Sequence, residues 1–317
     1  MKKILKKILS FFNLKVSKSF DNRRDKKYFS KFGVNPIEID YNYKENKLRF
    51  IELDIDIDLN REVFFVENYH VVKKMINIYD AKFYKDNGDI YINVNGLRIN
   101  LQTSEEFFII NEVFVNGIYN LNTDDEYILF DIGMNVGITS LYFVSKKNVT
   151  KIFAFEPFEL TYNQAIKNIK INKFEKIINT YNYGLGGETK AMTVDYVPDF
   201  RGSMGKDGVP DYLRQKISFS MKQEINIVAI DKVFLDILKL NPSSKFVFKV
   251  DCEGSEYEII KKLDDCDLLK YIYAFFIEWH FKGPNEINEI LVKNKYQVFS
   301  FDDYNNETGM IYASRKI

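Results

Sequence analysis

The stretch Tyr127–Phe143, YILFDIGMNVGITSLYF, is the most informative part of this 317-residue chain about its fold. Four apolar residues are followed by an acid, Asp131, as expected for a buried strand that ends at a sheet edge. Two glycines, Gly133 and Gly137, come next, and a helical pattern begins after the second. In α/β sheets, ligands bind at the carboxyl ends of the strands, where glycine lets the backbone approach a ligand closely. The stretch therefore predicts a strand, a ligand-binding turn and a helix.

The same alternation continues from this stretch to the C-terminus. Short apolar strands that alternate with helices indicate a mostly parallel, doubly wound α/β sheet with helices on both faces. The predicted strands are residues 127–133, 151–157, 177–186, 246–254, 271–280, 296–302 and 309–315. The predicted helices are residues 137–147, 158–172, 255–263 and 283–294.

The residues before this stretch are predicted to form two further parts. The expected parts are a basic N-terminal segment at 1–45, a small α/β region at 46–125 and the main domain at 126–317. Within the small region, residues 47–59 alternate and predict one strand, and the Asn95-Gly96 pair predicts a hairpin. Thr103 and Glu106 stand at the spacing of a helix capping box.

One segment interrupts the alternation of the main domain. Residues 198–224 show few core-forming periods and contain several glycines. A loop of this length inside a compact domain is usually functional or disordered. We expect it to be a lid over an acceptor site.

The charge distribution limits the classes of partner. The formal net charge is zero, which speaks against a nucleic-acid enzyme, because such proteins usually carry a basic surplus. Residues 1–31 hold eleven Lys or Arg and two Asp or Glu. They suggest a solvated terminus or, alternatively, a basic amphipathic helix on an anionic membrane surface. Cys252 and Cys266 match no zinc spacing and fit a reducing compartment, so we expect a cytoplasmic protein. Peripheral contact with the inner membrane surface through the basic segment is the alternative.

The turn after the first strand favours one class of cofactor. Gly133–Gly137 reads G-M-N-V-G, which lacks the middle glycine of a dinucleotide motif, and no G-K-S/T follows. Asp131 would repel a phosphate and would suit a ligand with a positive pole. S-adenosylmethionine (SAM) has an ammonium, a sulfonium and no phosphate. The next strand ends at Glu156, where a carboxylate can accept hydrogen bonds from both ribose hydroxyls.

Four segments carry a family resemblance: FDIGMNVGITSLYF, FAFEPFELTYNQAIKN, FKVDCEGSEYEII and IEWH. They resemble the FkbM family of SAM-dependent methyltransferases. The most specific piece is KVDCEG at Lys249–Gly254, close to the family's K-I-D-V-E-G-A-E, with Ser255 in place of the usual Ala. The resemblance runs from about Glu105 to the C-terminus and leaves residues 1–100 outside. It implies a class I methyltransferase fold and, from many members, O-methylation of a sugar or secondary metabolite.

Within this framework, seven residues are expected to bind the cofactor. They are Asp131, Gly133, Asn135 and Gly137 at the methionine end, Glu156 at the ribose, and Asn182 and Gly184 by the adenine.

Four residues at the ends of the fourth and fifth strands are the predicted catalytic residues. Asp251 and Glu253 could orient an acceptor hydroxyl, act as base or hold a cation; alternatively they are structural acids at a helix N-terminus. Glu278 and His280 fall on one face of the fifth strand, and an imidazole can serve as base near neutral pH. The four could together bind a divalent metal, although the sequence does not favour that interpretation.

Three hypotheses for the activity remain. Amino-directed DNA methyltransferases carry D/N-P-P-Y/F where this chain has D-C-E-G, and no cysteine follows a proline as in cytosine C5 enzymes. A small-molecule or glycan O-methyltransferase is therefore the leading prediction. The alternatives are a catalytically silent cofactor-binding or regulatory protein and an RNA methyltransferase that uses the basic N-terminus. The sequence leaves the oligomeric state open.

Overall fold

The computed structural model describes residues 28–35, 37–42, 44–205, 219–302 and 308–315. These fall into two compact units. The N-terminal unit comprises residues 1–118 with 215–219, and the C-terminal unit comprises residues 119–214 and 220–317. Residues 1–27, which carry most of the basic segment predicted to contact a membrane or RNA, lie outside the described residues.

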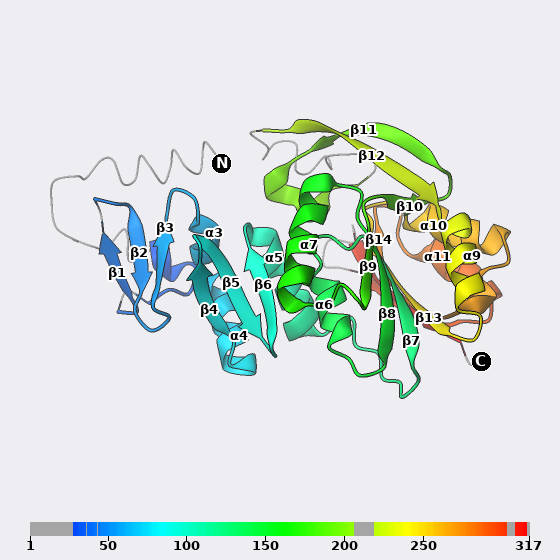
Figure 1. Cartoon of the computed structure of the whole chain (residues 1–317), viewed down its shortest axis with the longest axis horizontal. Helices are drawn as coiled ribbons and strands as arrows, with labels where there is room; N and C mark the ends of the chain where they lie inside the picture. The colour runs from blue at the N-terminus through cyan, green and yellow to red at the C-terminus, as the bar shows by residue number, and fades with distance from the viewer. Residues whose placement is uncertain (1–27, 36, 43, 206–218, 303–307, 316–317) are drawn as a thin grey trace. The chain divides into compact units, whose positions relative to one another are not determined.

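The N-terminal unit contains two antiparallel three-stranded sheets (Figure 1). The first sheet has the order β1-β2-β3 and the second has the order β4-β5-β6. The strands are β1 Ile39–Asn42, β2 Lys47–Phe50, β3 Ile55–Asp58, β4 Lys82–Asp86, β5 Asp89–Val94 and β6 Leu97–Leu101. The helices are α3 Val63–Glu67, α4 Tyr69–Tyr79, α5 Ser104–Ile110 and the π-helix η1 Asn111–Asn116.

The prediction of one strand over residues 47–59 is wrong. The chain turns back after Phe50, with Asp54 at a left-handed φ of 52°, and the two halves pair as β2 and β3. Phe50 pairs with Ile55, and both side chains are buried. The apolar residues of both strands therefore point to the same buried face. In the sequence, this hairpin gives the same alternation as one long strand.

The local turn and cap predictions for this unit are confirmed. Asn95 (φ 51°) and Gly96 (φ 81°) connect β5 to β6, as a type I′ hairpin turn requires. The hydroxyl of Thr103 accepts a hydrogen bond from the backbone N–H of Glu105 at 3.2 Å. The backbone N–H of Thr103 donates to the Glu106 carboxylate at 2.6 Å, so the capping box is formed.

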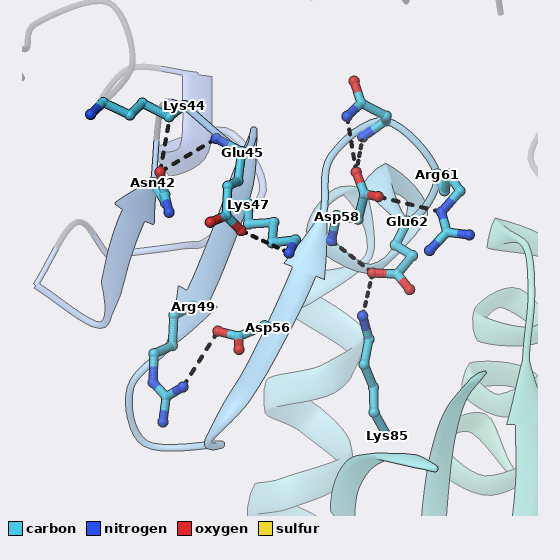
Figure 2. A network of polar contacts seen from close by, with 11 residues as sticks. Asn42, Lys44, Glu45, Lys47, Arg49, Asp56, Asp58, Arg61, Glu62 and Lys85 are labelled. Carbon is cyan, nitrogen blue, oxygen red and sulfur yellow. Dashed lines mark hydrogen bonds and ion pairs between the residues drawn. The ribbon is translucent and has the colours of Figure 1, made fainter. Parts of the chain in front are cut away.

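Figure 2 shows the polar contacts around the first sheet. The pairs Lys47–Glu45 (2.8 Å) and Arg49–Asp56 (3.5 Å) are exposed and contribute little to stability. The Glu62 carboxylate is more buried: it accepts from the Lys85 ammonium at 2.6 Å and from the backbone N–H of Asp58 at 2.7 Å. This carboxylate therefore ties the end of β3 to β4.

The C-terminal unit is built on a seven-stranded sheet with the order β15-β16-β14-β13-β7-β8-β9. All neighbours are parallel except that β16 runs antiparallel to β14 and β15. The strands are β7 Tyr127–Ile132, β8 Val149–Phe155, β9 Ile178–Tyr181, β13 Lys245–Val250, β14 Ile272–His280, β15 Gln297–Asp302 and β16 Thr308–Ser314. The predicted class of fold, a doubly wound and mostly parallel α/β sheet, is confirmed.

Helices cover both faces of this sheet (Figure 1). On one face, Phe130 of β7 packs edge-on against Phe234 of α9, with ring centroids 5.4 Å apart. On the other face, Phe143 of α6 lies 5.9 Å from Phe276 of β14. The helices are α6 Ile138–Val144, α7 Glu159–Asn172, α9 Ile230–Leu240, α10 Glu256–Asp265, α11 Asn285–Lys293 and the 3-10 turn η3 Leu269–Tyr271.

A second small sheet, β10-β12-β11, corrects two predictions. Its strands are β10 Gly184–Gly186, β11 Lys190–Tyr196 and β12 Met221–Ala229. The predicted strand 177–186 is therefore two strands, β9 and β10, in different sheets. Of the predicted loop 198–224, the start is the 3-10 segment η2 Pro198–Ser203, the last four residues belong to β12, and residues 206–218 lie outside the described residues. No helix in the described ranges combines the length and apolar character that a bilayer crossing requires.

Candidate functional site

A cavity opens at the carboxyl ends of β7, β8 and β13 in the C-terminal unit. Residues from the turns after these strands, from the small sheet and from η2 line it. They are Ile132, Gly133, Asn135, Glu156, Pro157, Phe158, Gly184, Leu185, Arg201, Gly202, Met204, Gly205, Ile225, Ile227, Asp251, Cys252, Glu253 and Ser255. Six of the predicted site residues are in this set. The other five, Asp131, Gly137, Asn182, Glu278 and His280, are not.

The turn after β7 needs glycine because another chain segment lies against it. Gly133 has a φ of 80°, and a Cβ there would lie 1.7 Å from the carbonyl oxygen of Asp251. Asn135 is also left-handed (φ 52°), a conformation that asparagine tolerates better than most residues. Gly137 is the N-cap residue of α6, and a Cβ there would meet Ala165 at 3.3 Å. Gly133 thus shapes the cavity, whereas Gly137 serves helix packing.

Glu156 directly follows the last residue of β8, and its carboxylate lies at the cavity. One oxygen accepts from the backbone N–H of Asn135 at 3.0 Å, and the other accepts from the backbone N–H of Phe158 at 2.9 Å. Burial raises the pKa of Glu156 to about 7, although these two bonds favour the charged form. The carboxylate joins the turns after β7 and β8 and keeps further acceptor capacity for a ligand.

Asn182 acts on the same turn from outside the cavity. Its side-chain amide donates to the backbone carbonyls of Glu156 at 3.0 Å and Pro157 at 3.3 Å. Gly184, two residues later, does line the cavity, and a Cβ there would meet Ile227 at 2.7 Å. Of the two residues predicted to lie by an adenine, Gly184 therefore lines the cavity and Asn182 does not.

Asp131 lies beneath the cavity and not in its wall. Its side chain is completely buried, accepts a hydrogen bond from the Ser140 hydroxyl at 2.6 Å and lies 3.4 Å from the Lys249 ammonium. Lys249 also donates to the carbonyl of Gly133 at 2.5 Å and pairs with Asp251 at 3.2 Å. Burial lowers the pKa of Lys249, but Asp251 and Asp131 outweigh burial and raise it, so the ammonium stays charged.

Sequence reasoning gave Lys249 no role, although a signal was present. A lysine inside the apolar strand FVFKV has to be compensated if it is buried. Register supplies the partner, because Lys249 of β13 stands opposite Asp131 of β7. The resulting Asp131–Lys249–Asp251 triad fixes the positions of the two turns that form the floor of the cavity.

Glu256 organises the loop after β13 and was also missed. Ser255 occupies the N-cap position of α10, but its side chain makes no capping hydrogen bond. Instead, the fully buried Glu256 carboxylate accepts from the backbone N–H groups of Cys252 at 3.0 Å and Gly254 at 2.9 Å. Within this loop Glu253 has a left-handed φ of 52°, a strained conformation for a residue with a side chain.

His280 stands at the end of β14 with carboxylates on both ring nitrogens. Its Nδ1 lies 3.0 Å from Glu256, and its Nε2 lies 3.8 Å from both Glu253 and Glu278. Burial lowers the pKa of His280, but the three carboxylates outweigh burial and hold it well above its ordinary value. Burial also raises the pKa of Glu253 to about 8. The structure thus brings Glu253, Glu278 and His280 together, whereas the strand pattern had placed only Glu278 and His280 on one face.

The 3-10 segment η2 and the two residues after it lie at the cavity. Arg201, Gly202, Met204 and Gly205 line the cavity, and a Cβ at Gly205 would lie 2.3 Å from the carbonyl oxygen of Glu253. The start of the predicted lid therefore lies at the cavity. That it opens and closes stays a prediction.

Comparison with known proteins gives the family context of this site. The family model described as "Methyltransferase FkbM domain" matches residues 131–301. A protein named Methyltransferase 1 from Beauveria bassiana is 29% identical over 169 residues, which are 50% of this chain and 67% of that protein. Methyltransferase sdnD from Sordaria araneosa is 25% identical over 183 residues, 51% of this chain and 70% of its own.

Among solved structures, similarity extends to a methyltransferase FkbM from Methylobacillus flagellatus. The sequences are 14% identical, the TM-score is 0.40, and the match covers 79% of this chain and 60% of that one. The matched family segment begins at Asp131 and ends within β15, so it contains the cavity and the cluster around His280. Residues 1–118 lie outside it.

Proposed function

Because the chain belongs to the FkbM methyltransferase family, we propose that it transfers the methyl group of SAM to a hydroxyl of a sugar, a glycan or a small metabolite. The observation that carries the proposal is the cavity at the carboxyl ends of β7, β8 and β13. Its lining includes the glycine turn at Gly133, the buried carboxylate of Glu156 and the carboxylate of Asp251 in the loop after β13.

The residues present fit SAM better than a phosphate-containing cofactor. Asp131, Glu156 and Asp251 lie at or just below the cavity, and their charges would repel the pyrophosphate of a dinucleotide. SAM carries a sulfonium and an ammonium and has no phosphate. Gly133 provides room, because any side chain there would collide with the backbone of Asp251.

We assign the parts of the cofactor site as follows. When bound, SAM supplies an electrophilic methyl group on sulfur. Glu156 would accept hydrogen bonds from the ribose hydroxyls. Hydrogen bonds to an ionised carboxylate are charge-assisted and therefore strong. Gly133 and Asn135 would lie along the methionine half. Asp131 would act at a distance, by holding Lys249 and through it Asp251.

The part of the cavity next to β13 and β14, where we place the methyl acceptor, is rich in carboxylates, and this supports a hydroxyl acceptor. Asp251 and Glu253 line the cavity and can accept hydrogen bonds from hydroxyl groups, and Glu278 and His280 lie beside them. Burial raises the pKa of the Cys252 thiol, so a thiolate nucleophile at this position is disfavoured. Methyl transfer to oxygen needs positioning of the acceptor more than covalent catalysis.

Turnover with radiolabelled SAM tests the proposal. The full chain is incubated with methyl-labelled SAM and pools of monosaccharides, oligosaccharides and small alcohols, and the products are identified by mass spectrometry. We expect methyl ethers. Loss of a charged hydrogen-bond acceptor costs about 1.5–3 kcal/mol, so Glu156→Ala should weaken SAM use about 10- to 100-fold.

The matched control is Glu159→Ala, three residues away and exposed in the first turn of α7. It should leave SAM use unchanged. Products methylated only on nitrogen or sulfur would contradict O-methylation. Equal labelling by the Glu156 and Glu159 variants would contradict the cofactor site.

A further inference from the structure

Three side chains at the ends of β13 and β14 each bring one ligand atom to the same place. Asp251 and Glu253 offer a carboxylate oxygen each, His280 offers a ring nitrogen, and all three atoms lie within 4.8 Å of one another. With metal–ligand bonds of about 2.1 Å, neighbouring and opposite ligands of an octahedral site are about 3 and 4 Å apart. Small side-chain adjustments would therefore bring the three atoms onto one cation.

The histidine is oriented as a metal ligand would be. Its side chain is buried, and its Nδ1 lies 3.0 Å from the Glu256 carboxylate. That carboxylate already accepts two backbone N–H groups, from Cys252 and Gly254, so it acts as an acceptor toward Nδ1–H as well. With Nδ1–H directed at Glu256, the proton on Nε2 is the one that a bound cation would displace, and Nε2 faces Glu253 at 3.8 Å, too far for a hydrogen bond. A carboxylate behind a histidine is the usual support of a histidine that binds a metal.

The local charge also favours a cation. Glu278 lies 3.8 Å from the same Nε2 and adds a third carboxylate beside Asp251 and Glu253. The Lys249 ammonium pairs with Asp251 at 3.2 Å, but it also balances the buried Asp131. One ammonium shared between two carboxylates leaves a negative excess next to His280. Two carboxylate oxygens and one imidazole suit Mn²⁺ or Mg²⁺ better than thiolate-preferring metals.

We propose that Asp251, Glu253 and His280 bind one divalent cation of the Mn²⁺ or Mg²⁺ type, and that Glu256 positions the imidazole. The sequence alone did not favour a metal, because it does not show that Glu256 reaches His280. Binding of the cation stands apart from the proposed function. Its role, to hold the acceptor hydroxyl where Asp251 and Glu253 line the cavity, rests on the proposed function.

Titration of the metal-free full chain with Mn²⁺, without SAM, tests the site. Electron paramagnetic resonance measures free Mn²⁺, and calorimetry measures stoichiometry. We expect one Mn²⁺ per chain. Glu253→Gln and His280→Gln should each weaken binding by about tenfold or more, because each replaces a carboxylate or imidazole ligand by a neutral amide. Glu289→Gln, at an exposed position of α11, is the matched control and should bind as the unchanged protein does.

Two results would overturn the proposal. One is the absence of stoichiometric binding by the folded, unchanged chain up to about 1 mM Mn²⁺, the weak end of the range of protein cation sites. The other is binding by both ligand variants equal to that of the Glu289 control, with the fluorescence of the buried Trp279 confirming that each variant is folded. Since SAM is absent, Mn²⁺ binding combined with a separate failure to bind SAM would count against the proposed function alone.

Discussion

Replacement of Lys249 by methionine should destabilise the C-terminal unit strongly. The Lys249 side chain is 2% exposed and lies 3.4 Å from Asp131 and 3.2 Å from Asp251. Without it, the completely buried Asp131 keeps the Ser140 hydrogen bond but loses its positive partner. Removing one member of a buried ion pair costs about 3–5 kcal/mol. In a unit of this size, that corresponds to a fall in Tm of about 6–20 °C.

Urea unfolding followed by tryptophan fluorescence measures this effect. The chain has one tryptophan, Trp279, which is buried in β14, so its emission reports on the C-terminal unit. A second substitution, Asp131→Asn, removes the uncompensated charge. The double variant should recover about half of the loss, because a neutral amide is cheaper to bury than an unpaired carboxylate.

The control is Lys245→Met, four residues earlier in the same strand. Lys245 pairs with Asp125 at 2.5 Å, but both side chains are substantially exposed, so the loss should stay below about 1 kcal/mol. A Lys249→Met cost as small as that of the control would refute the argument. So would the absence of any recovery on adding Asp131→Asn.

Further outcomes follow from the same structure. Gly133→Ala should abolish SAM binding and destabilise the C-terminal unit more than Gly283→Ala, because a Cβ at Gly133 meets the backbone of Asp251 while one at Gly283, also at a left-handed φ, meets nothing within 4 Å; equal costs in urea would exclude this reason. The pKa of Glu156 is about 7 when folded, above its ordinary value of 4.5, so its contribution is fully present below about pH 4.5 and is lost as pH rises through 7. The loss is about 3 kcal/mol, and Glu156→Gln should flatten the fall in urea midpoint between pH 5 and 8. Thr103→Ala should cost about 1 kcal/mol in the N-terminal unit, measured by circular dichroism, and no change would argue against the capping box.

The sequence was most informative where the structure is local. The glycine spacing after Tyr127, the hairpin at Asn95-Gly96 and the Thr103 cap each depend on a few neighbouring residues. The carboxyl ends of parallel strands meet at one edge, so Glu156 and Asp251 could be placed near Gly133 before any coordinates were known. The strand pattern likewise put Glu278 and His280 on the same face.

The missed residues depend on contacts between distant segments. Alternation shows that Lys249 shares a face with other residues of β13, but only the register with β7 puts Asp131 opposite it. The bond from Glu256 to His280 joins the start of α10 to the end of β14, and no spacing predicts it. Asp131 was expected to touch the cofactor because an acid after a strand looks the same whether it faces a ligand or a buried lysine.

The wrong strand predictions arise where one hydrophobic pattern is compatible with two different structures. Residues 47–59 alternate in the same way in one long strand and in the β2–β3 hairpin. The segment 221–224 has few apolar residues and resembles a loop. It becomes strand because β12 pairs with β11 along its length.

Calorimetric titration of the purified full chain with SAM, and separately with NAD, tests whether the cavity binds SAM. We expect one SAM per chain with micromolar affinity, no heat from NAD, and weaker SAM binding by Glu156→Ala but not by Glu159→Ala. Failure of a folded chain to bind SAM, or preferential binding of NAD, would contradict the assignment of the cavity between β7, β8 and β13.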